Sequence, residues 1–342
     1  MIPTAAQAKV KTVYMGVPPS AQKTLNDKLN SDVNDFFPHS ISVRVGQNVR
    51  FDPSGFHTVD FPTRGARQLP LISATGTKLS GVMDAAGNPF WFNGQDQLGF
   101  TPALGKMLYG KSVVYDGTKR VESGLPFANH PKPFTVRFTK TGDYTYYCDV
   151  HPGMKGVVHV KSARARVASV AADTKAIERQ VSAAEKQAKR NAHTIPPTGV
   201  VYVGSSGPHG VETYSFFPSA VTVPIGTTLQ FKMSPNSYDV HTATTGPGDP
   251  MRDSNSYLGK LAASINSPVF DPAAVYPSDP PPNLPSLTPA AHGNGFWNTG
   301  VMDTSPQTSR LNSSGSVRFD APGTYEFYCL IHPFMHATVT VQ

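Results

Sequence analysis

The sequence predicts an all-β protein built from two β-sandwiches joined by a helix, and three observations lead to this prediction. The chain of 342 residues has only 15% charged residues, but its 39% hydrophobic residues are enough to form packed cores. One block of alternating apolar and polar residues, punctuated by Gly and Pro, occurs twice. Between the two copies lies a segment with neither Gly nor Pro, which is typical of a helix.

The repeat defines the two sandwiches. Three features recur at nearly constant offsets of 180, 184 and 181 residues: the FFP triplets at 36–38 and 216–218, His57 and His241, and Cys148 and Cys329. Such agreement predicts one module of about 150 residues present in two copies. The predicted domains are therefore residues 1–161, a linker at 162–193, and residues 194–342.

Strand patterns recur at matching places in each copy. ISVRV at 41–45 and VTVPI at 221–225 alternate in polarity, and YTYYC and YEFYC each follow a glycine turn and lead into VVHV or TVTV. This order of short strands separated by turns is typical of small antiparallel sandwiches. Each copy also carries a long insertion, at 58–121 and 242–296, whose role the sequence leaves open.

The segment at 163–190 is predicted to be the linking helix. Its apolar stripe repeats at spacings of three and four and comprises Val167, Val170, Thr174, Ile177, Val181, Ala184 and Ala188. We expect this stripe to pack on one or both sandwiches; weak self-association of two chains through it is the alternative. From Lys161 to Arg190 there are eight basic and three acidic residues, so this segment supplies +5 of the net charge of +7. Because the basicity is local, nucleic-acid binding is not expected.

A Cys-x-x-His-x-x-Met motif closes each module and carries the chemistry. The candidate ligands are Cys148, His151 and Met154 with upstream His57, and Cys329, His332 and Met335 with upstream His241. Copper that cycles between two oxidation states is held by one thiolate, two imidazoles and a weak axial thioether. Zinc is the weaker alternative because methionine is a poor zinc ligand. A Cys148–Cys329 disulfide is disfavoured because each cysteine holds the equivalent place in its own module.

The segments TGDYTYYCDVHPGMKGVVHV and PGTYEFYCLIHPFMHATVTV closely resemble the ligand loop of plastocyanin-like cupredoxins. The resemblance covers residues 12–160 and 200–342 apart from the insertions. It implies two Greek-key cupredoxin β-sandwiches, one type 1 (blue) copper in each, bound by the two ligand sets above, and one-electron transfer. One departure concerns Thr58 and Thr242, which stand where the family commonly has Asn, and it leaves the tuning of both sites open.

An electron carrier without catalytic residues is the function we expect. Multicopper oxidases and nitrite reductases, the enzyme alternative, join the blue centre to a second copper through a histidine adjacent to the cysteine. Here Tyr147 and Asp149 flank one cysteine, and Tyr328 and Leu330 flank the other. A copper-handling protein, the third reading, would favour more sulfur ligands than nine Met and two Cys.

The remaining expectations concern partners and location. Redox proteins with acidic docking surfaces are the candidate partners, and no apolar run reaches the ~18 residues of a membrane-spanning helix. The composition suits an extracytoplasmic protein, periplasmic or secreted. The first residues, MIPTAAQAKV, lack the apolar region of a signal peptide, so we expect such a peptide not to be present in this chain.

Overall fold

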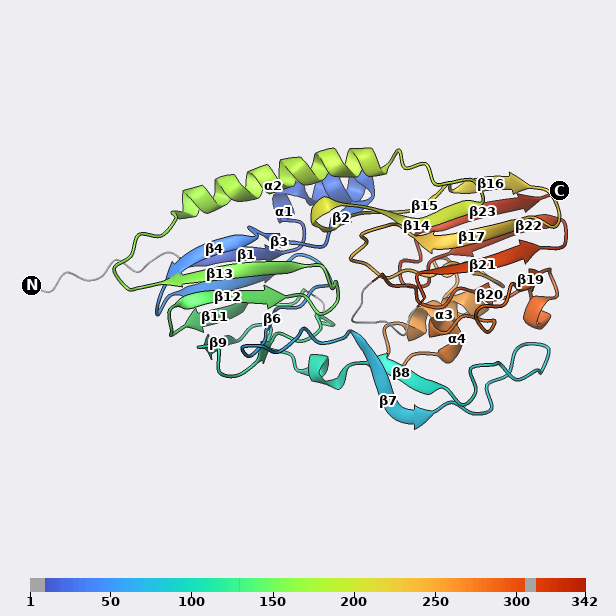
Figure 1. The fold of residues 1–342 in the computed structure, drawn as a ribbon, viewed down its shortest axis with the longest axis horizontal. Coiled ribbons are helices and arrows are strands. Elements are labelled where there is room, and N and C mark those ends of the chain that lie inside the picture. Colours follow the sequence, from blue (N-terminus) through green and yellow to red (C-terminus); the bar gives the residue numbers. More distant parts are fainter. Residues whose placement is uncertain (1–9, 129, 305–311) are drawn as a thin grey trace, which may run out of the picture. The chain divides into compact units, whose positions relative to one another are not determined.

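The computed structural model describes residues 10–128, 130–304 and 312–342, and most of its regular structure is β, as predicted. Contacts divide the chain into two compact units, shown as one ribbon in Figure 1. Unit 1 comprises Met1–Leu71, Pro102–Lys189 and Pro208–Val211; unit 2 comprises Ile72–Thr101, Arg190–Gly207 and Glu212–Gln342.

Unit 1 contains two five-stranded sheets. The first has the order β3 (Phe36–Phe37), β1 (Lys11–Met15), β5 (Asn48–Pro53), β11 (Phe134–Phe138) and β9 (Ser112–Tyr115). The second has the order β10 (Val121–Glu122), β6 (Asp60–Phe61), β12 (Gly142–Tyr147), β13 (Lys155–Lys161) and β4 (Ser40–Arg44). Phe51 of the first sheet meets Phe61 and Tyr146 of the second, with ring centroids 5.7 and 5.2 Å apart. The alternating residues of both sheets therefore bury a shared aromatic core.

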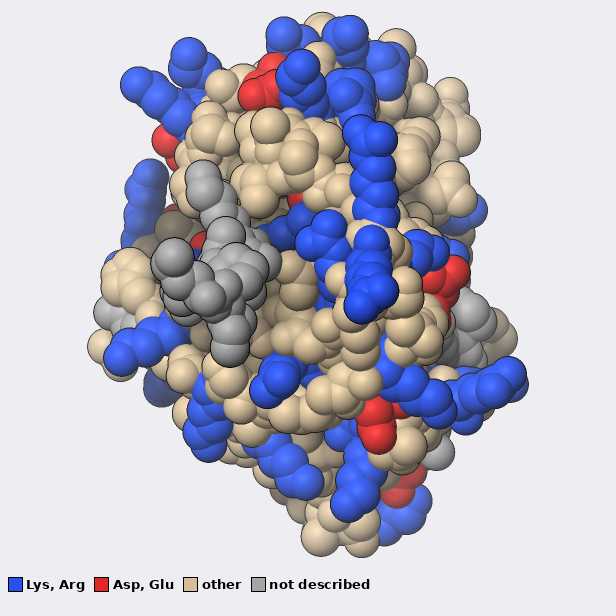
Figure 2. Space-filling model, turned by 90° about the vertical axis from the view of Figure 1, so that its left-hand side faces the viewer, with Lys and Arg blue, Asp and Glu red and all other residues tan. Residues whose placement is uncertain are grey.

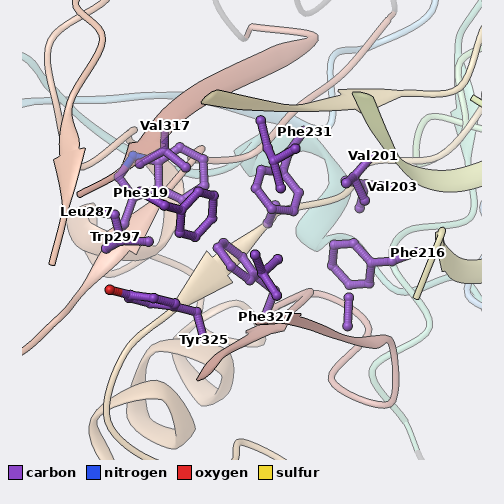
Figure 3. Close-up of a cluster of buried hydrophobic side chains, with 14 of the residues drawn as sticks. Val201, Val203, Phe216, Phe231, Leu287, Trp297, Val317, Phe319, Tyr325 and Phe327 are labelled. Atoms are coloured by element: carbon purple, nitrogen blue, oxygen red, sulfur yellow. The ribbon is translucent and has the colours of Figure 1, made fainter. Parts of the chain in front are cut away.

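Unit 2 repeats this arrangement. One sheet includes β19 (Ser286–Leu287), β21 (Ser314–Phe319), β17 (Thr228–Met233), β14 (Val200–Gly207) and β15 (Val211–Phe217), in that order. The other is β16 (Ala220–Val223), β23 (His336–Val341), β22 (Gly323–Tyr328), β18 (Thr244–Thr245) and β20 (Trp297–Asn298). Phe231 and Phe327, one from each sheet, stack 4.4 Å apart at the centre of the core (Figure 3). Cys329 and Met335 belong to the same buried cluster, so the candidate ligands are anchored in the core.

The linking helix forms, but it begins later than predicted. Helix α2 spans Val170–Asn191, whereas we expected it to start at 163. The Ser169 hydroxyl accepts a hydrogen bond from the backbone N–H of Ala172 at 3.2 Å and caps the first turn, so Val167 precedes the helix. The later members of the stripe pack in unit 1 on residues of α1 (Pro19–Gln22), η1 (Lys23–Lys28) and β2 (Ser31–Val33): Ile177, Val181, Ala184 and Ala188.

The segment Ile72–Thr101 belongs to unit 2, although it lies in the insertion of the first module. It forms the hairpin β7 (Ile72–Lys78) and β8 (Asp96–Phe100) and then packs near α3 (Tyr257–Ser264) and α4 (Pro272–Val275). Phe92 stacks on Tyr276 with ring centroids 5.5 Å apart, and the Trp91 indole donates a hydrogen bond to the Pro277 carbonyl. The predicted boundaries after 161 and 193 stay a prediction.

Short helical turns complete the structure: η2 (Pro102–Gly105), η3 (Pro208–Gly210) and η4 (Ala291–Gly293). Within the described ranges, no helix is both long and apolar enough to cross a membrane.

Candidate metal centres

Three candidate ligands converge in unit 1. The Cys148 Sγ lies 3.9 Å from Nδ1 of His57 and 3.7 Å from Nδ1 of His151, and the two Nδ1 atoms are 3.0 Å apart. All three side chains are buried. The loop carrying two of them is closed by backbone hydrogen bonds from Cys148 N–H to the Met154 carbonyl and from Met154 N–H to the His151 carbonyl. Met154 is 1% exposed, so the fourth predicted ligand is buried in the same loop.

Unit 2 brings together the equivalent set. The Cys329 Sγ lies 3.7 Å from Nδ1 of His241 and 3.8 Å from Nδ1 of His332, and these two nitrogens are 3.2 Å apart. Cys329 N–H donates to the Met335 carbonyl, as in the first loop, and Met335 is 1% exposed. Two segments 181 residues apart in sequence thus give the same local geometry in different units.

Thr58 and Thr242 tie the upstream histidines to the cysteine loops. Each donates its backbone N–H to the cysteine sulfur of its unit at 3.4 Å. Each hydroxyl accepts the backbone N–H of the residue after the cysteine, Asp149 or Leu330, at 2.8 Å. The threonine hydroxyl thereby fixes the ligand loop, and N–H donation to sulfur is one way a protein tunes a metal thiolate.

Two glycines that sequence reasoning missed make room for the upstream histidines. Gly16 and Gly204 both have positive φ, and a Cβ atom would lie 2.6 Å from Nε2 of His57 and 2.7 Å from Nε2 of His241, respectively. No side chain can be accommodated at that distance without moving the imidazole. The repeated YMG and YVG triplets, at 14–16 and 202–204, were the available signal.

Glu212 is a third residue that the sequence did not reveal. It is 1% exposed, and its Oε1 lies 3.5 Å from Nε2 of His241. Its other oxygen accepts hydrogen bonds from the hydroxyls of Ser206 and Ser237. A carboxylate behind a ligand histidine fixes the tautomer and raises the basicity of the imidazole. Burial opposes the charged form of His241, but its hydrogen bonds with Cys329 and Glu212 raise its pKa well above the usual range.

The two thiols differ in the metal-free protein. Burial raises the pKa of Cys148 to about 12. Burial also opposes ionisation of Cys329, but hydrogen bonds with His241 and His332 outweigh it and lower the pKa to about 5. The thiolate is the metal-binding form of cysteine, so each thiol must lose its proton when its site binds a metal ion.

A buried group of carboxyls lies beside the unit 1 site. Asp60, Glu122 and Asp149 place ligand-type oxygens within 4.8 Å of one another, and Nη1 of Arg120 is 3.4 Å from Asp60. Burial is the main cause that raises the pKa of Asp60 to about 8 and that of Asp149 to about 6, and it raises that of Glu122 as well. The group therefore carries fewer charges at neutral pH than three carboxyls would in water.

The donor sets fit copper. Each unit offers one sulfur and two imidazole nitrogens within 4.8 Å of one another, with a buried methionine closing the same loop. This is the combination that copper favours when it exchanges electrons, whereas a structural zinc site would be completed by Cys, His or carboxylate.

Comparisons with known proteins reach only parts of the chain. No protein-family model matches it. A stretch of 33 residues is 52% identical to "Amicyanin-alpha" of Methylorubrum extorquens, covering 10% of this chain and 28% of that protein.

Solved structures that are similar to the chain include three cupredoxins. An oxidized plastocyanin from Dryopteris crassirhizoma is 18% identical, with a TM-score of 0.21, and the match covers 42% of this chain and 99% of that chain. A purple cupredoxin from Nitrosopumilus maritimus is 15% identical, with a TM-score of 0.20 and coverage of 42% and 98%. A reduced Cu(I) form of an amicyanin mutant is 14% identical, with a TM-score of 0.22 and coverage of 44% and 89%. Because these identities and TM-scores are low, the description of the fold rests on the strand order given above and not on these matches.

Proposed function

We propose that the protein is a copper-binding electron-transfer protein with one type 1 copper in each of two cupredoxin-type units. The observation that carries this proposal is the duplicated cluster of one buried cysteine and two histidines, each closed by a buried methionine. Copper held in this way supplies reversible one-electron exchange between Cu(II) and Cu(I).

The chain's residues have separate roles in this proposal. Cys148 and Cys329 supply the thiolates. The hydrogen bonds of the two threonines hold the ligand segments together, so the protein should rearrange little when the copper changes its oxidation state. Rigid positioning of this kind is what a functional site requires of its support.

Exposed aromatic rings stand near both sites and suit transient docking. Phe56 precedes His57 and packs on Phe127 with ring centroids 5.6 Å apart, and these rings are 39% and 48% exposed. Phe334 is 50% exposed and lies 6.0 Å from the His332 ring. Aromatic residues are enriched at protein interfaces, so these rings are the proposed contact points for redox partners.

Copper analysis combined with a visible spectrum tests the proposal. We expect two copper ions per chain and an intense thiolate-to-Cu(II) absorption. Cys148→Ala and Cys329→Ala should each remove about half of the copper and of the colour, and the double variant should remove both. Wild-type protein that stays colourless with Cu(II), or that binds one copper, would contradict the tandem assignment.

The charge of unit 1 favours acidic partners. By sequence, unit 1 holds 23 Lys and Arg residues against 12 Asp and Glu, whereas unit 2 holds 7 against 11. Figure 2 shows a face on which Lys and Arg are dense and Asp and Glu are few. A field of this sign accelerates association with negatively charged proteins and weakens as salt is added. An extracytoplasmic location remains part of the proposal.

Charge reversal on the linking segment tests this docking mode. Changing Arg164, Arg166, Lys186 and Lys189 to Glu should leave both copper spectra unchanged and slow electron exchange with an acidic partner at low salt. The difference should shrink as ionic strength rises. Equal rates at low salt would remove this segment from the docking surface. Self-association through α2 stays a prediction, and the stripe from Ile177 to Ala188 already packs within unit 1.

The enzyme alternative has a direct assay. Neither cysteine is followed by a histidine, so the proposed sites have no covalent route through a histidine to a catalytic copper. We expect no substantial oxygen uptake or nitrite consumption by copper-loaded protein with a reductant. Turnover of about 1 s⁻¹ or more would favour an oxidase or a reductase.

A further inference from the structure

We propose that Asp35, His39 and His209 of unit 1 form a further metal site, separate from the cysteine sites, for a divalent ion of the zinc or copper(II) class. One carboxylate oxygen and two imidazole nitrogens lie within 4.8 Å of one another. Nδ1 of His39 is 2.8 Å from Oδ1 of Asp35, and the two imidazole ring centroids are 5.2 Å apart. This proposal does not depend on the copper sites.

Backbone hydrogen bonds hold the three residues in place. Asn34, next to Asp35, donates its N–H to the carbonyl of Gly210, next to His209, at 2.8 Å. The carbonyl of Asp35 accepts the N–H of Gly16, and the carbonyl of His39 accepts the N–H of Val157. The arrangement is therefore built by the fold and does not rely on side chains meeting by chance. Prior positioning of ligands is what distinguishes a binding site from a surface cluster.

The neighbours of the Asp35 carboxylate do not fully stabilise its negative charge. The Asp35 side chain is only 7% exposed, and Oδ1 accepts the N–H of Phe36 at 2.8 Å in addition to its contact with His39. Burial nevertheless raises the pKa of Asp35, which means that these partners do not fully offset the loss of water. A cation at this place would stabilise the buried charge directly.

His209 adopts an uncommon backbone conformation. Its φ and ψ are 60° and 36°, in the left-handed region that a residue with a side chain seldom occupies. The ring is exposed and stands beside His39. Strained conformations of this kind concentrate at functional sites, where the position of the side chain matters more than local stability.

The donor set selects the class of ion. Two imidazoles and one carboxylate suit Zn²⁺, Cu²⁺ or Ni²⁺, whereas Ca²⁺ and Mg²⁺ take mostly oxygen ligands. The His39 side chain is 37% exposed and His209 is exposed, so water can complete the coordination. The site is thus more open than the two cysteine sites. The competing explanation is an Asp35–His39 ion pair that binds no metal.

Calorimetric titration of copper-loaded protein with Zn²⁺ distinguishes the proposed metal site from an ion pair that binds no metal. Wild type should bind one Zn²⁺ per chain, and His209→Asn should lower the affinity at least about 10-fold, as loss of a supporting group already does at metal sites. Asn tolerates the left-handed conformation, so this variant removes the ligand and keeps the turn. Asp35→Asn should have a similar effect. His193→Asn, at another exposed histidine, is the matched control and should bind as wild type.

Two results would overturn the proposal. Wild type that takes up no Zn²⁺, or His209→Asn that binds Zn²⁺ as tightly as wild type, would leave only the ion pair. If the cysteine sites do not hold copper, Zn²⁺ could enter them instead. Repeating the titration with the double variant Cys148→Ala, Cys329→Ala separates the cases, because binding that needs His209 should persist in it.

Discussion

The carboxylate of Glu212 should lower the reduction potential of the copper that we propose for unit 2. Glu212 is buried, and its Oε1 lies 3.5 Å from Nε2 of His241, the nitrogen that faces away from the thiolate. A negative charge there stabilises Cu(II) more than Cu(I). Glu212→Gln removes the charge and keeps the shape and the acceptor for Ser237, so the potential should rise.

The size of the effect follows from the distance. An imidazole measures about 2 Å between its nitrogens and a metal–nitrogen bond is about 2 Å, which places the carboxylate about 7 Å from the metal. Two unit charges at that distance interact by about 2 kcal/mol at an effective dielectric constant of ~20. For a one-electron couple this corresponds to a shift of about 100 mV.

Redox titration followed by visible absorption measures the shift. The unit 1 site in the same molecule is an internal reference and should keep its potential. Glu326→Gln changes a glutamate with a 41% exposed side chain in unit 2 and is the matched control. A shift below about 20 mV for Glu212→Gln, or a shift to lower potential, would refute the electrostatic account.

Two further predictions follow from the geometry. Gly204→Ala should empty or distort the unit 2 site, because its Cβ would meet Nε2 of the ligand histidine. Gly226→Ala is the control: it has a φ of 84° and no atom within 4 Å of its Cβ, so it should suffer only backbone strain and keep the copper spectrum. Equal copper content in the two variants would contradict this prediction. His292 lies between Asp279 at 3.4 Å and Asp84 at 3.3 Å, and its hydrogen bond with Asp279 is the main cause of its raised pKa. The stabilisation of the folded state by these ion pairs is fully present below about pH 6.5 and is lost as pH rises through the raised pKa. Urea unfolding should therefore show that the excess free energy of unfolding of wild type over His292→Gln disappears across this pH range. A difference that does not change with pH would exclude the ion pairs.

Local motifs explain why the candidate ligands could be predicted. Cys148, His151 and Met154 lie within seven residues, so a single loop after a strand brings them together whatever the rest of the chain does. The upstream histidines required the repeat, because 91 residues separate His57 from Cys148. Glu212 was not predictable, since nothing near it in the sequence indicates that it faces His241.

Other features depended on competition between local and distant contacts. Helix propensity alone extended the linking helix to 163, but Ser169 supplies a cap and the helix begins at Val170. The sequence indicates that Phe90 and Phe92 are core residues but not in which unit they pack. Their place beside Phe296 and Tyr276 is decided by packing that no sequence period encodes.

The assignment of Ile72–Thr101 to unit 2 has a consequence for synthesis of the chain. Leu98 of this segment packs in a cluster with Phe270, Val275 and Val301, which emerge from the ribosome about 170 to 200 residues later. At roughly 5–20 residues per second, the segment waits on the order of 10–40 s without its partners. During that time its apolar side chains are available to chaperones or to aggregation. A fragment that ends at 161 would contain this segment without Phe270, Val275 and Val301, so we expect it to expose the same apolar side chains.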